Sequence, residues 1–188
     1  MDEDVQALGW VPVEGRGSLP FALVHGESLV AAASWAVGEA GVQLVDASVG
    51  FDQVRTAGRP LLLHDPLCPL TPADFLVEAV ETCERTGRVV VGWREVTDTV
   101  KQRDGDLLGA TLDRTALRAV ASPVVIPAEV LAGLPSLDST DLPALVGRLA
   151  EVAELHWLPA PPIARRITDT DDLVVLEALS RSLAGPAR

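Results

Sequence analysis

The sequence predicts an α/β domain with a mostly parallel sheet and helices on both of its faces. The chain has 188 residues, 48% of them hydrophobic, which is enough for one domain with a substantial core. Short runs rich in valine and leucine alternate with amphipathic segments, and this alternation is typical of βαβ units. No segment recurs at the period of about 20–50 residues that marks a repeat protein. We therefore expect residues 1–188 to form a single domain.

The N-terminal half is expected to alternate between strands and helices. Ser28 suits the N-cap of a first helix, and Gly41 follows its end. The Thr71-Pro72 pair marks the start of a second helix, because threonine suits the cap and proline the first helical position. Gly87 ends that helix. The expected elements are strands at 8–13, 42–45 and 61–63, helices at 28–40 and 71–86, and a loop at 54–60.

The C-terminal half adds a hairpin to this alternation. Asp104-Gly105 is a good turn, so residues 97–111 are expected to form a long hairpin near the middle of the chain. Either Thr140 or Asp141 caps one later helix, and Asp169 or Thr170 caps the last. The other expected elements are strands at 88–96, 124–126, 155–158 and 165–168, helices at 113–120, 141–154 and 171–184, and a helical turn after Pro127.

Charge and composition argue against several classes of partner. The formal net charge of −12 repels nucleic-acid phosphates and anionic lipid, so we expect neither nucleic acid nor membrane as a partner. A local group of arginines can still bind a small phosphorylated ligand. The acidic N-terminus is unlike a secretory signal, and we expect a cytoplasmic protein. The two cysteines, Cys68 and Cys83, are too few for a zinc site by themselves.

Two candidate site segments follow expected strands. Gly15 and Gly17 flank Arg16 in a turn that can present backbone N–H groups to a nucleotide phosphate, although an ordinary turn explains the same residues. Asp65 follows the apolar run 61–63, at the sheet edge where open α/β sheets bind ligands. Its carboxylate can hold Mg²⁺, or it can cap a turn before the next residue, Pro66.

Three further candidates lie near the expected hairpin and at the last strand. Thr99 and Arg114 flank the hairpin, and a hydroxyl with a guanidinium suits a phosphate. Turn and cap chemistry explains the same residues. Arg165 and Arg166 are adjacent cations in an acidic protein and can bind an anion, but on an exposed strand such arginines are usually only solvated.

The order of these motifs is more specific than any of them alone. The chain resembles the 2-C-methyl-D-erythritol 4-phosphate cytidylyltransferases, firmly over residues 61–130, less so from 155 onward, and poorly before 60. The motifs that support the resemblance are Leu63-His64-Asp65, Thr97-Asp98-Thr99-Val100-Lys101, Asp104-Gly105-Asp106, Thr111-Leu112-Asp113-Arg114 and Arg166-Ile167-Thr168.

The resemblance implies a Rossmann-like nucleotidyltransferase fold and a specific site. Enzymes of the family transfer CMP from CTP to methylerythritol phosphate, release pyrophosphate, and are homodimers that exchange a β-arm. Thr99 and Arg114 match residues that grip the substrate phosphate, with Arg114 reaching in from the partner subunit. Arg166 takes the place of a lysine there, and Asp65 matches the metal-binding aspartate, which implies Mg²⁺ if the protein is active. Residues 97–111 match the exchanged arm.

Departures from the family concentrate in the nucleotide half of the site. Phe21 stands in the place of the catalytic lysine, and an aromatic ring cannot neutralise charge on a reacting phosphoryl group. We expect this ring to fill or close the triphosphate space. The segment from His64 to Pro69, which includes Cys68, lacks the arginine that the family has in this motif. The 42–60 segment is shorter than in the family and omits a βα unit that recognises the cytosine and ribose of the nucleotide. Arg16, which is always charged, is the candidate replacement cation.

Two functions from different classes follow from these residues. The first is a pseudoenzyme: a dimeric phosphate-ligand-binding or regulatory module with no cofactor, which pairs through the arm with itself or with an intact cytidylyltransferase paralogue. The second is an active nucleotidyltransferase that uses Mg²⁺ and Arg16. A cysteine enzyme at Cys68 is disfavoured, because no basic helix start lies beside it. In a dimer we expect Arg114 of one chain to approach Thr99 or Arg166 of the other.

Overall fold

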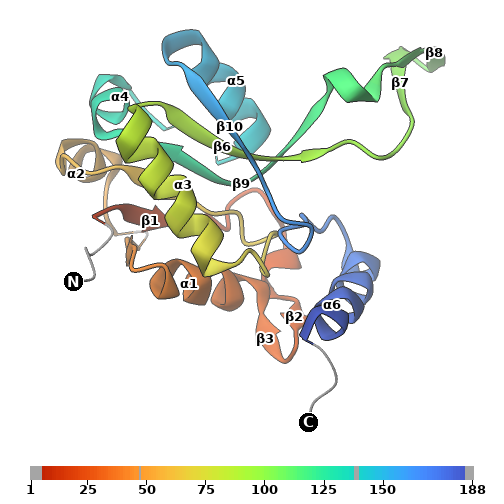
Figure 1. Ribbon diagram of the computed structural model, residues 1–188, viewed down its shortest axis with the longest axis horizontal. Coiled ribbons are helices and arrows are strands. Elements are labelled where there is room, and N and C mark those ends of the chain that lie inside the picture. Colours follow the sequence, from red (N-terminus) through yellow and green to blue (C-terminus); the bar gives the residue numbers. More distant parts are fainter. Residues whose placement is uncertain (1–5, 47, 138–139, 185–188) are drawn as a thin grey trace.

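A six-stranded mixed sheet forms the centre of the molecule (Figure 1). The computed structural model describes residues 6–46, 48–137 and 140–184. The strand order is β10-β6-β9-β5-β1-β4, and every neighbouring pair is parallel except those that include β9. The strands are β1 (Leu8–Trp10), β4 (Gln43–Leu44), β5 (Leu61–Leu63), β6 (Val89–Glu95), β9 (Arg118–Ile126) and β10 (Leu155–Pro159).

Helices cover both faces of this sheet, as expected. Successive residues of a strand point to opposite faces, so Leu62 packs in one apolar cluster while Leu61 and Leu63 pack in the other. The first cluster includes side chains of α1 and α3, and the second includes side chains of α2, α4 and α5. These helices are α1 (Leu29–Glu39), α2 (Phe51–Thr56), α3 (Ala73–Thr86), α4 (Ala128–Gly133) and α5 (Leu142–Val152).

Helix ends follow the local signals in the sequence. The Ser28 hydroxyl accepts a hydrogen bond from the Ala31 N–H at the start of α1. Gly87 ends α3 in the left-handed region, at φ +64°, where a side chain would be strained. Of the two residues expected to cap α5, Asp141 does so. The start of α3 differs from the expectation by one position: its N-cap is Pro72, without a side-chain cap bond, and the Thr71 hydroxyl donates to the Cys68 carbonyl (2.8 Å).

Three expected elements differ from the structure. Residues 51–56 form α2, where part of the segment was expected to be a loop. The expected helix at 113–120 is reduced to a 3-10 turn at Arg114–Ala116, because the following residues extend β9 by antiparallel pairing with β6. Residues 165–168 form no strand. The Ile167 N–H donates to the Leu67 carbonyl (2.8 Å), and the Thr168 N–H donates to the Asp172 carboxylate of α6 (2.8 Å), so this stretch does not pair along a strand.

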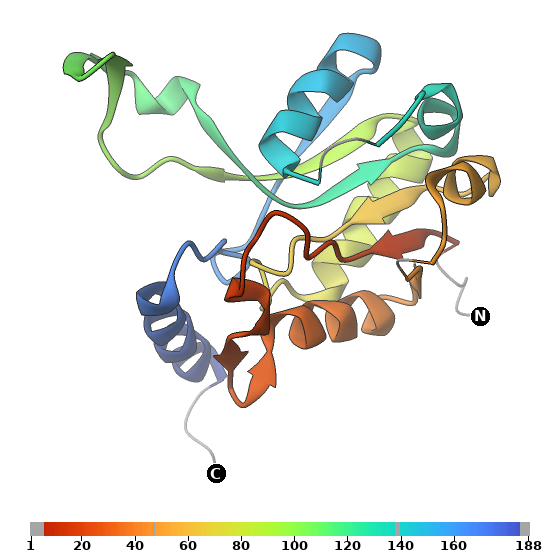
Figure 2. The ribbon, with the colours of Figure 1, turned by 180° about the vertical axis from the view of Figure 1, so that it is seen from behind.

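The hairpin is present where the sequence predicts it. Strands β7 (Val100–Asp104) and β8 (Leu107–Leu112) pair antiparallel around Gly105, which has φ +57°. The hairpin projects away from the sheet on two extended segments (Figures 1 and 2). Leu107 and Leu108 are 75% and 74% exposed, so the arm buries little of its own apolar surface.

The C-terminal helix α6 (Thr170–Ala184) closes a third apolar cluster beside the sheet edge. Leu173 and Leu176 of α6 pack with Val24 of the small β2 (Leu23–Val24) and β3 (Glu27–Ser28) hairpin. Leu67 and Ile167 complete the cluster, which fixes the segments after β5 and β10 against each other. Among the described residues, no helix combines the length and apolarity needed to cross a membrane.

Candidate functional site

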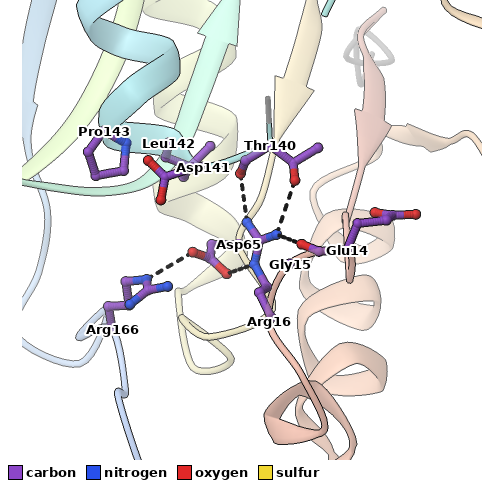
Figure 3. A pocket seen from close by; sticks show the side chains of 9 residues that line it. All are labelled: Glu14, Gly15, Arg16, Asp65, Thr140, Asp141, Leu142, Pro143 and Arg166. Carbon is purple, nitrogen blue, oxygen red and sulfur yellow. Dashed lines mark hydrogen bonds and ion pairs between the residues drawn. The ribbon is translucent and has the colours of Figure 1, made fainter. Parts of the chain in front are cut away.

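Asp65 lies at the centre of the site, directly after β5 and at the carboxyl end of the sheet. Its side chain is only 2% exposed. Its Oδ1 accepts a hydrogen bond from Arg16 Nε at 2.8 Å, and its Oδ2 accepts one from Arg166 Nε at 3.0 Å (Figure 3). The sequence predicted each of these three residues separately for the site. The structure brings them into one contact, which we call the carboxylate clamp.

Burial and the two guanidiniums act in opposite directions on the Asp65 carboxyl. Burial by itself raises the pKa of Asp65, but hydrogen bonds and charge from Arg16, followed by the Leu67 N–H and Arg166, hold that pKa below its ordinary value. The group is therefore ionised at neutral pH. The carboxylate carries one negative charge against two positive ones, so the clamp has a net positive charge in an otherwise acidic protein.

Two buried polar residues, Ser122 and His64, hold the backbone at Asp65 in place. The Ser122 hydroxyl accepts a hydrogen bond from the Asp65 N–H at 2.9 Å and also contacts His64 Nδ1. Burial lowers the pKa of His64 to about 4, although the nearby Asp65 charge acts in the opposite direction. His64 is therefore neutral and fully enclosed at neutral pH, and its role is to position the turn.

Arg16 joins three segments of the chain. Its Nη1 donates to the Glu14 carbonyl and the Thr140 hydroxyl, and its Nη2 donates to the Thr140 carbonyl at 2.8 Å. With the bond to Asp65, these contacts use all but one of the N–H donors of a guanidinium. The side chain is 6% exposed. Arg16 therefore acts as a tie between loops, with little capacity left for a ligand.

Thr140 is the site residue that sequence reasoning missed. Its only sequence signal was that of a helix cap, and Asp141 takes that role instead. The contact between Arg16 and Thr140 spans 124 positions in sequence. No local pattern indicates such a pairing, since it depends on how the loops after β1 and before α5 meet at the sheet edge.

Arg166 differs from Arg16 in its spare hydrogen-bonding capacity. Within the described part of the chain its guanidinium makes one hydrogen bond, to Asp65, and its side chain is 41% exposed. It borders two cavities. One, of about 300 Å³, also includes Gly15, Arg16 and Thr140 in its wall, and the other, of about 400 Å³, lies toward the base of the arm. The free edge of Arg166 is thus accessible to an anion.

The expected role of Phe21 is wrong. The ring was expected to fill or close the triphosphate space, but it is 60% exposed and does not line the cavity beside Gly15 and Arg16. Phe21 lies in a 3-10 turn at Leu19–Phe21 in which Pro20 takes the buried position. Gly15 and Gly17 both have positive φ, which the tight turn requires, and Gly15 lies at the cavity wall.

Thr99 and Arg114 lie at the base of the arm and are exposed. Arg114 Nη1 donates to the Thr97 carbonyl of the same chain, beside a cavity of about 310 Å³. The structure brings neither residue into the carboxylate clamp. The expected approach of Arg114 to Thr99 or Arg166 of a second chain stays a prediction.

The residues around Asp65 do not fit a resident Mg²⁺ in this arrangement. Mg²⁺ takes carboxylate and phosphate oxygens in near-octahedral geometry. Both Asp65 oxygens already accept hydrogen bonds from guanidiniums, whose positive charges repel a cation. Among the described residues, no group of three or more His, Cys, Asp or Glu side chains could hold a metal ion. A cysteine enzyme is disfavoured as well, because burial raises the pKa of Cys68 to about 12.

Comparisons with known proteins find similarity to cytidylyltransferases of the methylerythritol phosphate series, although no family model matches the chain. It is 36% identical over 121 residues to the 2-C-methyl-D-erythritol 4-phosphate cytidylyltransferase of Nocardia farcinica, covering 63% of this chain and 52% of that protein. It is 31% identical over 132 residues to the bifunctional enzyme IspD/IspF of Solidesulfovibrio magneticus, covering 68% of this chain and 32% of that enzyme. The chain thus spans about a third to a half of these relatives.

Solved structures confirm the fold prediction. A 4-diphosphocytidyl-2C-methyl-D-erythritol synthase structure matches with a TM-score of 0.69 at 12% identity, over 94% of this chain and 99% of that chain. The cytidylyltransferase structure from Thermus thermophilus matches with a TM-score of 0.61 at 20% identity, over 93% and 97%. At these identities the matches establish the fold alone. The Rossmann-like nucleotidyltransferase architecture is therefore confirmed.

Replacing Arg16 by methionine is expected to lower the free energy of unfolding by about 3 kcal/mol, because one partner of a buried ion pair is removed. The matched control is Arg88→Met, which breaks an exposed pair with Glu154 and should cost less than about 1 kcal/mol. Urea unfolding of both variants checks the difference. Equal losses would show that Arg16 does not tie the loops together.

Proposed function

We propose that this chain, a divergent and shortened relative of the 2-C-methyl-D-erythritol 4-phosphate cytidylyltransferases, binds a small phosphorylated ligand without transferring a nucleotide to it. The observation behind the proposal is the carboxylate clamp. Asp65 matches the metal-binding aspartate of those enzymes, yet both of its oxygens accept hydrogen bonds from guanidiniums. The group that a nucleotidyltransferase would use for its metal serves here as an internal counter-ion.

Phosphate binding is supported by the free edge of Arg166. A guanidinium presents paired N–H donors that match two phosphate oxygens, and such charge-assisted bonds are the strongest that proteins form with phosphate. Arg166 has N–H groups available, is partly exposed, and borders two cavities. Glu14 and Asp141 line the cavity on the Arg16 side, whereas three arginines line the cavity toward the arm, so the arm side of Arg166 is the more favourable place for an anion on an acidic surface.

Loss of nucleotidyl transfer is supported by the lack of a free cation at Arg16 and Phe21. Phosphoryl transfer depends on positive groups held against the charge that develops on the phosphoryl oxygens. Arg16, the candidate replacement for the missing lysine, is nearly saturated by Asp65, Glu14 and Thr140. Phe21, at the lysine position, is exposed away from the cavity. Neither residue supplies a free cation there.

A second candidate function is an active nucleotidyltransferase that transfers CMP or another nucleotide to a polyol phosphate. The observation that favours it is the cavity of about 300 Å³ beside Gly15 and Arg16, which Phe21 leaves open. A triphosphate that entered this cavity would compete with Asp65 for Arg16 and could release the guanidinium toward the phosphates.

We also propose that the arm pairs with a second copy of the chain. Leu107 and Leu108 expose most of their apolar surface at the tip of an arm that projects from the sheet. Isolated two-stranded hairpins are at best marginally stable in water, so a partner surface would stabilise the arm. An intact cytidylyltransferase paralogue is the alternative partner.

The purified protein, incubated with Mg²⁺, CTP and methylerythritol phosphate, is expected to release pyrophosphate at less than about a hundredth of the rate of an intact family enzyme, because the free cation is missing. Calorimetry with methylerythritol phosphate alone should still detect binding. Arg166→Ala should weaken that binding by about tenfold or more, while Arg88→Ala should leave it unchanged. Turnover comparable to the control enzyme would establish the second candidate instead.

The double substitution Leu107→Asp with Leu108→Asp is expected to convert a homodimer into monomers, because charges would be buried in the arm interface. Sedimentation equilibrium measures the change in mass. Val174→Asp, on an exposed apolar position of α6, is the matched control and should leave the dimer intact. A wild-type protein that sediments as a monomer at all concentrations would contradict pairing of the arm with a second copy.

A further inference from the structure

Three arginines border the cavity at the base of the arm, and only one of them belongs to the carboxylate clamp. This cavity of about 400 Å³ lies against the ends of β6 and β9 and against the segment that follows β10. Its charged lining residues are Arg94, Glu95, Asp98, Arg165 and Arg166. Ligand cavities commonly measure about 300–1,000 Å³, so the space suits a sugar-sized molecule.

Arg94 is held in place without being neutralised. It is half-buried near the end of β6, and its Nη1 donates to the Pro162 carbonyl at 3.1 Å. Among the described residues it has no ion-pair partner. A guanidinium fixed by one backbone contact presents its other donors with little loss of side-chain entropy on binding. Arg94 therefore has the features of a second anion-binding group.

Arg165 and the two carboxylates complete the lining. Arg165 Nη2 forms a 2.7 Å ion pair with Asp172 of α6, which leaves its Nε and Nη1 donors outside that pair. Glu95 and Asp98 are acceptors that repel phosphate but accept hydrogen bonds from hydroxyl groups. A cavity lined by both guanidiniums and carboxylates thus suits a molecule that carries both anionic groups and hydroxyls.

We infer that the ligand is a polyol with an anionic group at each end, one bound by Arg166 and the other by Arg94. This inference rests on the proposed phosphate-binding function and specifies its ligand. A ligand with a single phosphate on Arg166 leaves the spare N–H donors of Arg94, which forms no ion pair within the described residues, without an acceptor from the ligand. A second anionic group would accept hydrogen bonds from these donors, and the hydroxyls between the two ends would reach Glu95 and Asp98.

The test compares fructose 6-phosphate with fructose 1,6-bisphosphate by isothermal titration calorimetry. These probes share the same hydroxyl-bearing ketohexose and differ in one phosphate. The wild-type protein should bind the bisphosphate on the order of tenfold more tightly, the effect expected of one charge-assisted contact. Arg94→Gln should remove this preference while leaving the affinity for fructose 6-phosphate within about twofold of the wild-type value.

Two further variants distinguish a direct contact between Arg94 and the second phosphate from a general effect of net charge and from a loss of folding. Arg85→Gln removes the same charge from α3, outside the cavity, and should keep the full preference. Arg94→Lys restores the charge without the planar fork and should recover part of the preference. Thermal melts show whether each variant is folded. If Arg94→Gln is unfolded, the preference of Arg94→Lys for the bisphosphate is measured in its place.

Failure of the inference is distinguishable from failure of the proposed function. If fructose 6-phosphate binds in an Arg166-dependent manner but the bisphosphate binds no better, the second anion site is overturned and phosphate binding stands. The same holds if the preference survives Arg94→Gln. If neither sugar phosphate binds to the wild-type protein, this inference is overturned; the proposed function is overturned as well only if methylerythritol phosphate also fails to bind.

Discussion

A buried carboxylate with two guanidinium partners holds together the loops at the carboxyl edge of this sheet. Asp65 accepts from Arg16 on one oxygen and from Arg166 on the other, and Arg16 continues the connection to Thr140 (Figure 3). Segments that follow β1, β5 and β10 and precede α5 thus meet at one charged group. The two apolar clusters of the sheet fix the strands, the third cluster packs Leu67 against Ile167, and the clamp adds the polar contact that includes the loops after β1 and before α5.

The clamp has consequences for both binding and chemistry. The Arg16–Asp65 ion pair is deeply buried, so it is costly to desolvate and also costly to break on one side only, whereas Arg166 keeps 41% of its side chain exposed. An entering phosphate would meet Arg166 at its exposed edge without disturbing Arg16. A metal ion or triphosphate would have to displace a guanidinium first. In the proposed function, the same contact favours a bound anion and opposes the geometry of nucleotidyl transfer.

Local signals in the sequence predicted most of the fold and the identity of several site residues. Ser28 and Gly87 end helices through contacts with their own neighbours, and the arm follows from its turn residues. The expected strand at 165–168 does not form. Its apolar residue Ile167 packs against α6 and the segment after β5 instead of placing the chain along a sheet edge. The expected helix at 113–120 does not form, because residues from Arg118 onward pair with β6 in the sheet and this pairing outweighs their local preference for a helix.

The pairing within the site was beyond sequence reasoning. Asp65, Arg16 and Arg166 were each expected at the ligand, but nothing local indicates that the carboxylate will form ion pairs with both arginines. The resemblance to a family gives the order of residues along the chain and not the direction of a side chain. For that reason the exposed ring of Phe21 and the contact with Thr140 emerged only from the structure.

The most direct test of the account is whether Asp65 is available to a divalent cation. Titration with Mn²⁺ in the presence of CTP, followed by electron paramagnetic resonance, counts bound ions in the wild-type protein and in Asp65→Asn. The account predicts the same weak binding in both proteins, because both carboxylate oxygens are engaged by arginines. A tight Mn²⁺ site that disappears in Asp65→Asn would show that the clamp opens to a metal, and the non-catalytic proposal would be wrong.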